Sequence, residues 1–536
     1  MNRPDIVLYN ATVHTMEPDA PVARGVAIAG DRIAALAGDE RESTALCEAL
    51  APGGQAIDLG GHAVVPGMID AHLHFIEYSL RLDRVDIYEL ASLEQTLERV
   101  AAYAATVPPD RWIRGGGWNH NLWAGSTFPT RQDLDRAAPQ HPVALSSKDG
   151  HSLWINTRAM QIAGLDAGTP DVPGGSIYRD DEGVPTGILQ ENAMGMVYDH
   201  VERPSHAEMV AACRRGLAQA HRAGLTGIHD CEGAAALRVF QELAQAGELT
   251  LRVLAHIPAD TLDAAIELGL HDGLGNEWLR LAGIKAFADG SLGSRSAWML
   301  EPFEGEPGNC GIPTIAMDAL RDLVRKANQA GLSVAVHAIG DAANRAVLDA
   351  IEAARDTSAS PLRNRIEHAQ LLHPDDLPRL AALDVIASGQ PIHATADIDL
   401  VERHWGARGA TSYAWRSLLR AGTALAFGSD APVESISPLA GIHAAVTRRR
   451  ADGYPGPEGW HPEQALSVAQ ALHAYTLGAA YASGEEQLKG SLRPGKLADL
   501  VVLDRDIFQI APMDILNTQV LATMVGGQFV YQGEIQ

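Results

Sequence analysis

Apolar and polar positions alternate in two different ways along the middle of the chain. Short apolar runs bounded by glycine, proline or polar residues predict buried β-strands, and apolar residues at every third or fourth position predict amphipathic helices. One such helix is expected over 205–224, where Ser205 and Glu208 have the spacing of a capping box and Gly224 marks the end. It runs directly into an apolar strand at 225–230. A strand after a helix, repeated along the chain, is the pattern of a parallel α/β domain.

Eight strands of this kind follow one another through the middle of the chain. The first is the apolar run that leads into His72, and the others are expected at 225–230, 251–257, 281–290, 332–341, 363–370, 383–391 and 423–432. Eight strands that alternate with helices and close on themselves form a TIM barrel. The sequence therefore predicts a (β/α)8 barrel as the main fold.

The two ends of the chain differ from its middle. Both contain short segments rich in β-branched residues and punctuated by turn residues. We expect residues 1–66 and 485–536 to form one small β-sandwich together, and residues 67–484 to form the barrel domain. The segment from about 80 to 205 is too long for one connection, so it is predicted to be an insertion after the first barrel strand. Such an insertion is expected over the C-terminal mouth of the barrel, where it shapes the substrate site.

Composition narrows the class of protein. The 536 residues are 46% hydrophobic and 20% charged, which is typical of a globular protein. The formal net charge of −25 argues against a nucleic-acid partner, because phosphates require a basic surface. The four cysteines are scattered without a C-x-x-C motif, which predicts reduced thiols in a cytoplasmic protein. No segment approaches the roughly 18 apolar residues of a membrane span, so no membrane partner is expected.

The candidate chemistry lies at the ends of the predicted strands. The first strand ends in His72 and His74, which share a face because side chains alternate along a strand. Two imidazoles on one face can chelate a metal ion. Polar residues on later strands are Lys285 on the fourth, His337 on the fifth, His368 on the sixth and Asp430 on the eighth. The strand ends of a TIM barrel converge on one mouth, so we expect these residues to form one site.

Lys285 is the least ordinary of these residues. It lies in the apolar segment 283–287, where its pKa should fall and its amine become a nucleophile. A neutral lysine beside metal ions can add CO₂ and become a carbamate, which is an anionic bridge between two ions. The alternative is that Lys285 simply pairs with Asp289 or another acid.

Several longer motifs resemble those of one protein family. They are IKAFADGSLGSRSAWM, VHAIGDAANRAVLDAIE, RIEHAQLL, FGSDAPVESISPLAGIHAAVTRR and GSLRPGKLADLVVLD, together with GHSLWINTRAM in the insertion. With the polar residues at the strand ends, they resemble the amidohydrolase superfamily of metal-dependent hydrolases. In detail they resemble its YtcJ-like branch, which includes N-substituted formamide deformylases. The resemblance extends from residue 5 to about residue 530.

The resemblance implies a hydrolase that cleaves a C–N bond of an amide, an N-formyl or N-acyl amine, or a cyclic amide. It implies one metal held by His72, His74 and Asp430, and a second held by His337 and His368. Lys285, as N6-carboxylysine, would bridge the two. Zinc is the expected divalent metal, with one or two ions bound.

The same resemblance implies a reaction sequence and names Asp430 and His368 as the catalytic residues. Hydroxide on the metal would attack the carbonyl carbon of the substrate. Asp430 would take the proton and pass it to the leaving nitrogen.

Five further residues are expected to contact the substrate: Trp118 and His151 in the insertion, Asp289 after the fourth strand, and Gln390 and His393 after the seventh. Each has an ordinary structural alternative. The histidine of the insertion could stabilise its loop, and the tryptophan could pack inside the insertion. The aspartate could cap a turn or orient Lys285, and the two residues after the seventh strand could contact His368.

Two neighbouring features are expected to be structural. Glu367 should point to the strand face opposite that of His368. The basic run at 447–453 is expected to be the solvated end of a helix.

Two other functions remain open on the sequence alone. A deaminase of heterocyclic amines would use the same fold, but such enzymes place a glutamate shortly after the histidine of the fifth strand, and the segment 337–341 has none. A non-catalytic binding protein would lack metal ligands, and none is missing. The expected partner is a small-molecule substrate of unknown identity. Barrels of this kind often form homodimers, although no interface can be recognised.

Overall fold

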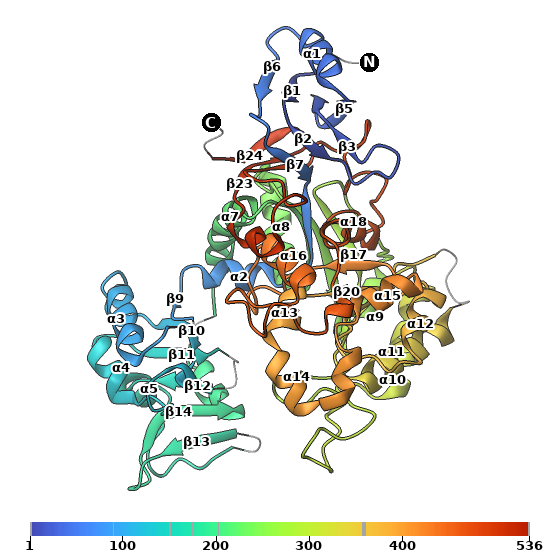
Figure 1. Ribbon diagram of the computed structural model, residues 1–536. Helices are drawn as coiled ribbons and strands as arrows, with labels where there is room; N and C mark the ends of the chain where they lie inside the picture. Colours follow the sequence, from blue (N-terminus) through green and yellow to red (C-terminus); the bar gives the residue numbers. More distant parts are fainter. Residues whose placement is uncertain are drawn as a thin grey trace. The chain divides into compact units, whose positions relative to one another are not determined.

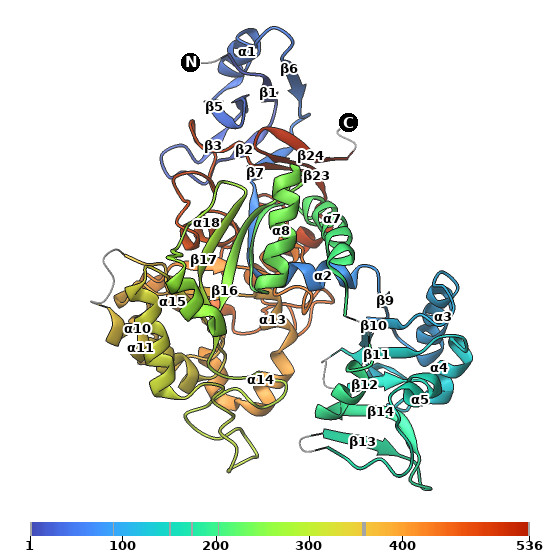
Figure 2. The same ribbon diagram turned by 180° about the vertical axis from the view of Figure 1, so that it is seen from behind.

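The computed structural model describes residues 3–88, 90–148, 152–172, 175–201, 203–355 and 361–533, and in it the chain divides into two units (Figures 1 and 2). The first unit comprises Met1–Ile76 and Cys213–Gln536. The second comprises Glu77–Ala212, the region predicted as an insertion. Among the described residues, no helix is both long and apolar enough to cross a membrane.

The first unit contains the predicted barrel of eight parallel strands. In order around the sheet they are β21 (Leu425–Phe427), β20 (Ile386–Gly389), β19 (Arg365–His368), β18 (Val334–Ala338), β17 (Leu279–Phe287), β16 (Arg252–Pro258), β15 (Leu225–Asp230) and β8 (Met68–Leu73). Two backbone hydrogen bonds join the chain after β21 to β8. Asp430 N donates to His72 O at 2.7 Å, and His74 N donates to Ala431 O at 2.8 Å. The eight predicted strands are thus confirmed, and their ends meet at one mouth.

Helices follow the strands of the barrel along the chain. Their bounds are α2 (Phe75–Arg81), α7 (His206–Arg222), α8 (Ala234–Ala246), α9 (Leu262–Glu267), α10 (Met317–Gln329), α11 (Asp341–Ala354), α12 (Leu377–Ala382), α13 (Pro391–Ala396), α14 (Ile398–His404), α15 (Trp415–Ala421), α16 (Pro438–Thr447), α17 (Val468–Ala474) and α18 (Leu477–Ala482). The predicted capping box begins α7, because Ser205 N donates to Glu208 Oε2 at 2.8 Å and Glu208 N donates to Ser205 Oγ at 3.3 Å. Gly224, at φ +85°, supplies the left-handed turn that leads into β15.

The two chain ends lie side by side and build the β-sandwich (Figure 1). One sheet consists of β5 (Arg32–Ala37), β4 (Gly25–Ala29), β1 (Ile6–Tyr9) and β6 (Gln55–Asp58), next to the helix α1 (Glu40–Glu48). The other consists of β24 (Gln528–Gln532), β23 (Val520–Val525), β22 (Leu500–Leu503), β7 (Ala63–Pro66), β2 (Thr12–His14) and β3 (Val22–Ala23). The antiparallel pair β7–β22 joins the ends. Apolar residues from both ends, such as Leu8, Val64 and Leu500, form one core.

The second unit has its own sheet and its own core. The sheet order is β13 (Gly175–Arg179), β14 (Pro185–Glu191), β12 (Ser152–Ile155), β11 (Val143–Ser147), β10 (Ile113–Trp118) and β9 (Val85–Asp86). Its helices are α3 (Leu93–Ala104), α4 (Arg131–Ala137), α5 (Thr157–Ile162) and α6 (Gly195–Tyr198). Trp118, Trp123 and Trp154 pack together in the core, with ring centroids 6.2–6.4 Å apart.

The prediction of a solvated basic run at 447–453 is wrong at Arg448. This residue is fully buried, and its guanidinium lies 5.0 Å from the ring centroid of Trp415 and 4.9 Å from that of Trp460. It also donates to the carbonyls of Trp460 at 3.0 Å and Tyr413 at 3.2 Å. Arg448 ends α16 in a left-handed conformation at φ +55°, and its side chain packs between the two indoles.

Candidate metal centre

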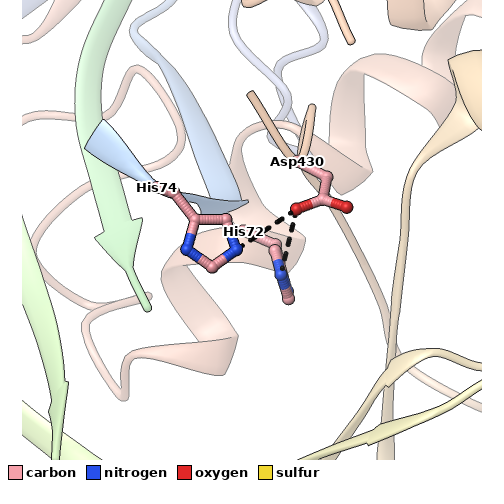
Figure 3. A group of neighbouring side chains, drawn as sticks. All are labelled: His72, His74 and Asp430. Atoms are coloured by element: carbon pink, nitrogen blue, oxygen red, sulfur yellow. Dashed lines mark ion pairs between the residues drawn. The ribbon is translucent and has the colours of Figure 1, made fainter. Parts of the chain in front are cut away.

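The barrel mouth brings together three predicted ligands from the first and eighth strands (Figure 3). The Nε2 atoms of His72 and His74 each lie 3.5 Å from Asp430 Oδ1. The backbone hydrogen bonds that join Asp430 and Ala431 to β8 hold the carboxylate in this position. The ligand atoms lie within 4.8 Å of one another, which is close enough to hold one metal ion.

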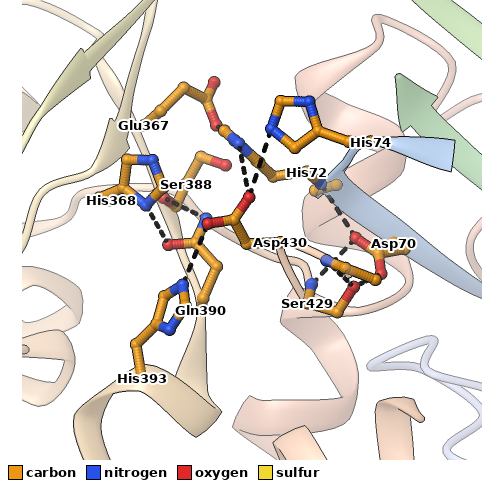
Figure 4. Close-up of polar contacts among 12 residues, drawn as sticks. Asp70, His72, His74, Glu367, His368, Ser388, Gln390, His393, Ser429 and Asp430 are labelled. Carbon is orange, nitrogen blue, oxygen red and sulfur yellow. Dashed lines mark hydrogen bonds and ion pairs between the residues drawn. The ribbon is translucent and has the colours of Figure 1, made fainter. Parts of the chain in front are cut away.

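A buried carboxylate ties the two ligand-bearing segments together (Figure 4). Asp70 accepts hydrogen bonds from His72 N at 3.0 Å, from Ser429 N at 3.0 Å and from Ser429 Oγ at 2.5 Å. Burial raises the pKa of Asp70 to about 7. The sequence placed Asp70 next to the histidines but indicated no role for it. The structure shows that it connects β8 to the residue before Asp430.

A second group of possible ligands shares Asp430 with the first. His368, His393 and Asp430 have ligand atoms within 4.8 Å of one another, and His393 Nε2 lies 3.2 Å from Asp430 Oδ2 (Figure 4). The sequence had suggested His393 as a substrate contact, and nothing in the pattern indicated that it would reach Asp430. His393 follows the pair Gln390–Pro391, which begins α13. No known metal-ligand motif has this spacing.

His337, predicted to be the partner of His368, lies beside this second group and outside it. Its ring centroid is 4.5 Å from that of His368, in an edge-to-face arrangement. Its Nε2 atom is 3.0 Å from Gly290 O and 3.6 Å from Asp289 Oδ1. Burial lowers the pKa of His337 to about 3, so the ring is neutral. Its role as a ligand stays a prediction.

His72 and His368 are each held through the ring nitrogen Nδ1 (Figure 4). His72 Nδ1 is hydrogen-bonded to Glu367 Oε2, and His368 Nδ1 lies 2.8 Å from Gln390 Oε1. A carboxylate or amide oxygen only accepts, so each Nδ1 carries the hydrogen. The lone pair is therefore on Nε2, which is the tautomer that a metal ligand needs.

Glu367 was expected on the strand face opposite His368, and this expectation is wrong. The side chain is fully buried and reaches His72 and Arg365. Burial alone would raise the pKa of Glu367, but the guanidinium of Arg365 and the ring of His72 hold it well below its usual range.

The physical reason is the backbone of His368, which has a φ of +72°. This left-handed conformation ends the alternation of strand faces, so consecutive residues of β19 both reach the site. Arg365 and Glu367 are two positions apart and share a strand face. An arginine and a glutamate at that spacing inside an apolar strand are the sequence signal for this buried pair.

The pKa values of Asp430 and of the histidines around it depend on burial and on their mutual hydrogen bonds. Burial would raise the pKa of Asp430, but hydrogen bonds from His393 and His74 hold it well below its usual range. Burial would lower the pKa of His393, but the hydrogen bond to Asp430 raises it to about 9. Burial lowers the pKa of His72, and it lowers that of His368 further. The neutral rings of His72 and His368 and the ionised carboxylate of Asp430 are in the protonation states that metal binding requires, whereas the raised pKa values of His393 and His74 favour their protonated forms.

Lys285 is buried near the mouth of the barrel, and among the described residues it has no hydrogen bond to Asp289 or to another acid, which was the alternative to a carbamate. The residue is 4% exposed, and Nζ has no hydrogen-bond partner among the described residues. Nζ lies 4.1 Å from the ring centroid of Phe287. Asp289, the alternative partner, instead accepts from the backbone amides of Trp298, Ile339 and Gly340 at 2.8–3.0 Å.

The predicted substrate contacts have different surroundings. Asp289 lies 3.6 Å from His337 but is used by three backbone amides, and burial raises its pKa to about 7. Gln390 contacts His368, which was one of its two expected roles. Trp118 is 1% exposed and donates to Leu145 O at 2.9 Å inside the second unit. His151 lies outside the described residues. Contact of these residues with a substrate stays a prediction.

The residues of the mouth fit a divalent metal. They offer neutral imidazole nitrogens with fixed tautomers and an ionised carboxylate, within reach of one another. The buried Nζ of Lys285, which has no hydrogen-bond partner within the described part of the chain, leaves a polar atom in the same region. An eight-stranded α/β barrel with such a centre, and a sandwich built from both chain ends, defines a metal-dependent hydrolase.

The particular family follows from comparison with known proteins. The chain belongs to the Amidohydrolase family, whose sequence profile matches residues 55–531. It is 31% identical to the putative amidohydrolase YtcJ of Bacillus subtilis, over 90% of this chain and 91% of that protein. It is 30% identical to the N-substituted formamide deformylase of Arthrobacter pascens, over 98% of each chain.

A solved structure agrees with this assignment. The crystal structure of an uncharacterized metal-dependent hydrolase from Pyrococcus furiosus is 30% identical and matches with a TM-score of 0.76, over 94% of this chain and all of that one. The resemblance inferred from the motifs is confirmed.

Proposed function

We propose that this protein hydrolyses the C–N bond of an amide, with N-formyl and N-acyl amines as its substrate class. In this reaction water supplies oxygen to the carbonyl carbon, the C–N bond breaks, and the nitrogen leaves as an amine. The observation that carries the proposal is the sharing of Asp430 between two groups of histidines. The similarity to a formamide deformylase over 98% of each chain supports the choice of bond.

Zinc is the proposed metal, because imidazole and carboxylate are ligands it favours. His72, His74 and Asp430 would hold one ion. His368 would hold a second together with His337 or His393. The Nζ atom of Lys285 is buried and lacks a hydrogen-bond partner among the described residues, which supports its modification to N6-carboxylysine. When bound, a divalent metal supplies a Lewis acid and lowers the pKa of a coordinated water to about 7.

Asp430 is the proposed proton carrier. Its two oxygens face different partners, since Oδ1 lies near His72 and His74 whereas Oδ2 lies 3.2 Å from His393 Nε2. One oxygen can therefore remain on the ligand side while the other accepts a proton and delivers it to the leaving nitrogen. His393 orients the carboxylate during this transfer.

Two apolar side chains near the site favour substrates with an apolar substituent. The ring of Phe287 lies 5.2 Å from the ring of His337 and is 49% exposed. Val433, three residues after Asp430, is 55% exposed. Apolar groups left exposed beside a polar centre can bury a substituent of the substrate.

The test is an assay of amine release from a panel of N-formyl and N-acyl amines, with ammonia release from heterocyclic amines measured in parallel. Zinc-loaded protein should hydrolyse at least one amide. Asp430→Asn should lower kcat by more than about 10³-fold, because it removes both a ligand and the proton carrier. Ammonia release without amide hydrolysis would show the protein to be a deaminase.

A further inference from the structure

The two histidines that are held through Nδ1 have partners of different charge. His72 is paired with a carboxylate, Glu367, and His368 with an amide, Gln390. We propose that Glu367, held by Arg365, and Gln390 are positioning residues that set how tightly the mouth binds its metal, with the larger contribution from Glu367. This inference rests on the metal site of the proposed function, but it concerns affinity rather than the reaction.

Arg365 makes Glu367 a fixed partner of His72. Its guanidinium pairs with the carboxylate through Nε, and through Nη2 at 3.1 Å. Nη2 also donates to Ser388 Oγ at 2.9 Å, and Nη1 donates to His229 Nδ1 at 3.0 Å. Arg365 and Glu367 are at most 1% exposed, so neither group can exchange these contacts for water.

The same guanidinium also holds the backbone next to the ligand. Arg365 Nη2 donates to the carbonyl of Ala71, which precedes His72. The ring of His72 is therefore fixed through Glu367, and its main chain is fixed through Arg365. A ligand that is held at both ends loses little conformational freedom when a metal binds, which favours tight binding.

Gln390 provides the same geometry without the charge. Its Oε1 accepts from His368, and its Nε2 donates to Ser388 O at 3.4 Å. A carboxylate draws the Nδ1 hydrogen more strongly than an amide does, so it makes the opposite nitrogen a better donor to a metal. The barrel thus contains two versions of one arrangement, in which a side-chain oxygen accepts a hydrogen bond from Nδ1 of a histidine. The acceptor is charged at His72 and neutral at His368.

A purely structural role for the buried pair is the alternative, and the chain offers a matched control. Arg252 and Asp499 form a second buried pair, with Nε–Oδ2 and Nη2–Oδ1 distances of 2.7 and 3.0 Å and side chains 2–3% exposed. The other described partner of the Asp499 carboxylate is Gly526 N, at 2.8 Å, so this pair holds no histidine. Asp499→Asn and Glu367→Gln make the same chemical change in the two pairs.

The experiment uses the full chain, freed of metal by a chelator, and titrates zinc alone against a chromophoric competitor. Glu367→Gln should weaken the tightest zinc-binding event by 10- to 100-fold. Asp499→Asn should lower the unfolding temperature and leave zinc affinity within threefold of wild type. Equal affinity in wild type and a folded Glu367→Gln variant would overturn the inference, as would equal weakening in both variants.

Gln390→Glu keeps the test decisive if Glu367→Gln fails to fold. It places a carboxylate on His368 and should tighten zinc binding by threefold or more, since it copies the arrangement at His72. Unchanged or weaker binding would contradict the inference. Failure of wild-type protein to bind zinc would instead count against the proposed function, so the two failures are distinguishable.

Discussion

Two buried arginine–carboxylate pairs lie in the first unit and differ in the further contacts of the carboxylate. Arg252–Asp499 joins the start of β16 to the residue before β22 of the sandwich, and both carboxylate oxygens are used by the guanidinium, with Gly526 N as a third donor. Arg365–Glu367 lies on β19, and one of its oxygens also holds His72. Burial is nearly the same, with side chains 0–3% exposed.

The comparison teaches that burial of an ion pair does not by itself indicate function. A buried pair that satisfies only itself and the backbone connects parts of the fold, and its loss is a matter of stability. A buried pair whose carboxylate also accepts a hydrogen bond from a candidate metal ligand, as Glu367 does from His72, is expected to affect how that histidine binds a metal. The following experiments can break or sharpen this distinction.

Removal of the metal should have the largest effect. Chelator-treated protein should lose more than about 10³-fold in kcat/KM on its best amide. The reason is that a metal acting as a Lewis acid stabilises the transition state by several kcal/mol. Added zinc should restore activity, as measured by amine release. The Asp499→Asn variant should show the same loss and the same recovery. A loss of less than tenfold in protein verified to be metal-free would contradict metal dependence.

Asp499→Ala should lower the free energy of unfolding, because it breaks the buried Arg252–Asp499 pair. It leaves Arg252 buried without its partner, which typically costs about 3–5 kcal/mol of the free energy of unfolding. Urea denaturation should show a lower midpoint, while kcat per folded molecule should stay within twofold of wild type. A large fall in kcat at unchanged stability would mean that the pair at the sandwich also acts on the site.

The pH dependence of the free energy of unfolding should reveal the buried carboxyl group of Asp289, which lies beside His337 near the candidate metal centre. Burial raises the pKa of Asp289 to about 7 from 3.8, so the folded state binds the proton more tightly than the unfolded chain does. Its stabilising contribution is therefore complete below about pH 4 and is lost as the pH rises to about 7, by at most about 1.4 kcal/mol per pH unit.

Metal-free wild type and Asp289→Asn should be compared by urea denaturation over this range. The difference between them should shift in favour of the variant as the pH rises, because asparagine does not titrate. A shift in favour of wild type would show that the backbone amides of Trp298, Ile339 and Gly340 stabilise the carboxylate more than burial destabilises it.

The smallest effect is expected at the apolar edge of the mouth. Phe287→Leu should raise KM for amides with a bulky apolar N-substituent by roughly three- to tenfold, an effect of about 1 kcal/mol from lost apolar contact. KM for N-methylformamide should change by less than twofold, and zinc content should not change. An equal rise for both substrates would assign Phe287 to the support of Lys285 or His337 instead.

The fold was predictable because it depends on patterns that repeat. Each of the eight strands is a short apolar run bounded by turn residues, and Ser205, Glu208 and Gly224 mark one helix by local chemistry alone. The β-branched residues and turn residues of both chain ends indicated a shared sandwich. The pairing of β7 with β22 joins the two ends in that sandwich. These features rest on local periodicity, which survives in one dimension.

The site was predictable only in part. His72, His74 and Asp430 come together because parallel strand ends converge in any closed barrel. The contact of His393 with Asp430 and the burial of Arg448 between two indoles depend on which way single side chains turn after an element ends. No pattern along the chain encodes that direction.

The sequence by itself thus determined the barrel, the sandwich and the residue types at the mouth, since these follow from alternation, turn residues and strand ends. Only the tertiary structure decided that Glu367 holds His72, that Gln390 holds His368, and that Lys285 has no acidic partner among the residues the structure describes. The physical reason lies in the backbone angles where strands end. The left-handed φ values of +72° at His368 and +60° at Asp430 redirect these side chains. Such backbone conformations are strained, and they persist only because the surrounding packing stabilises them.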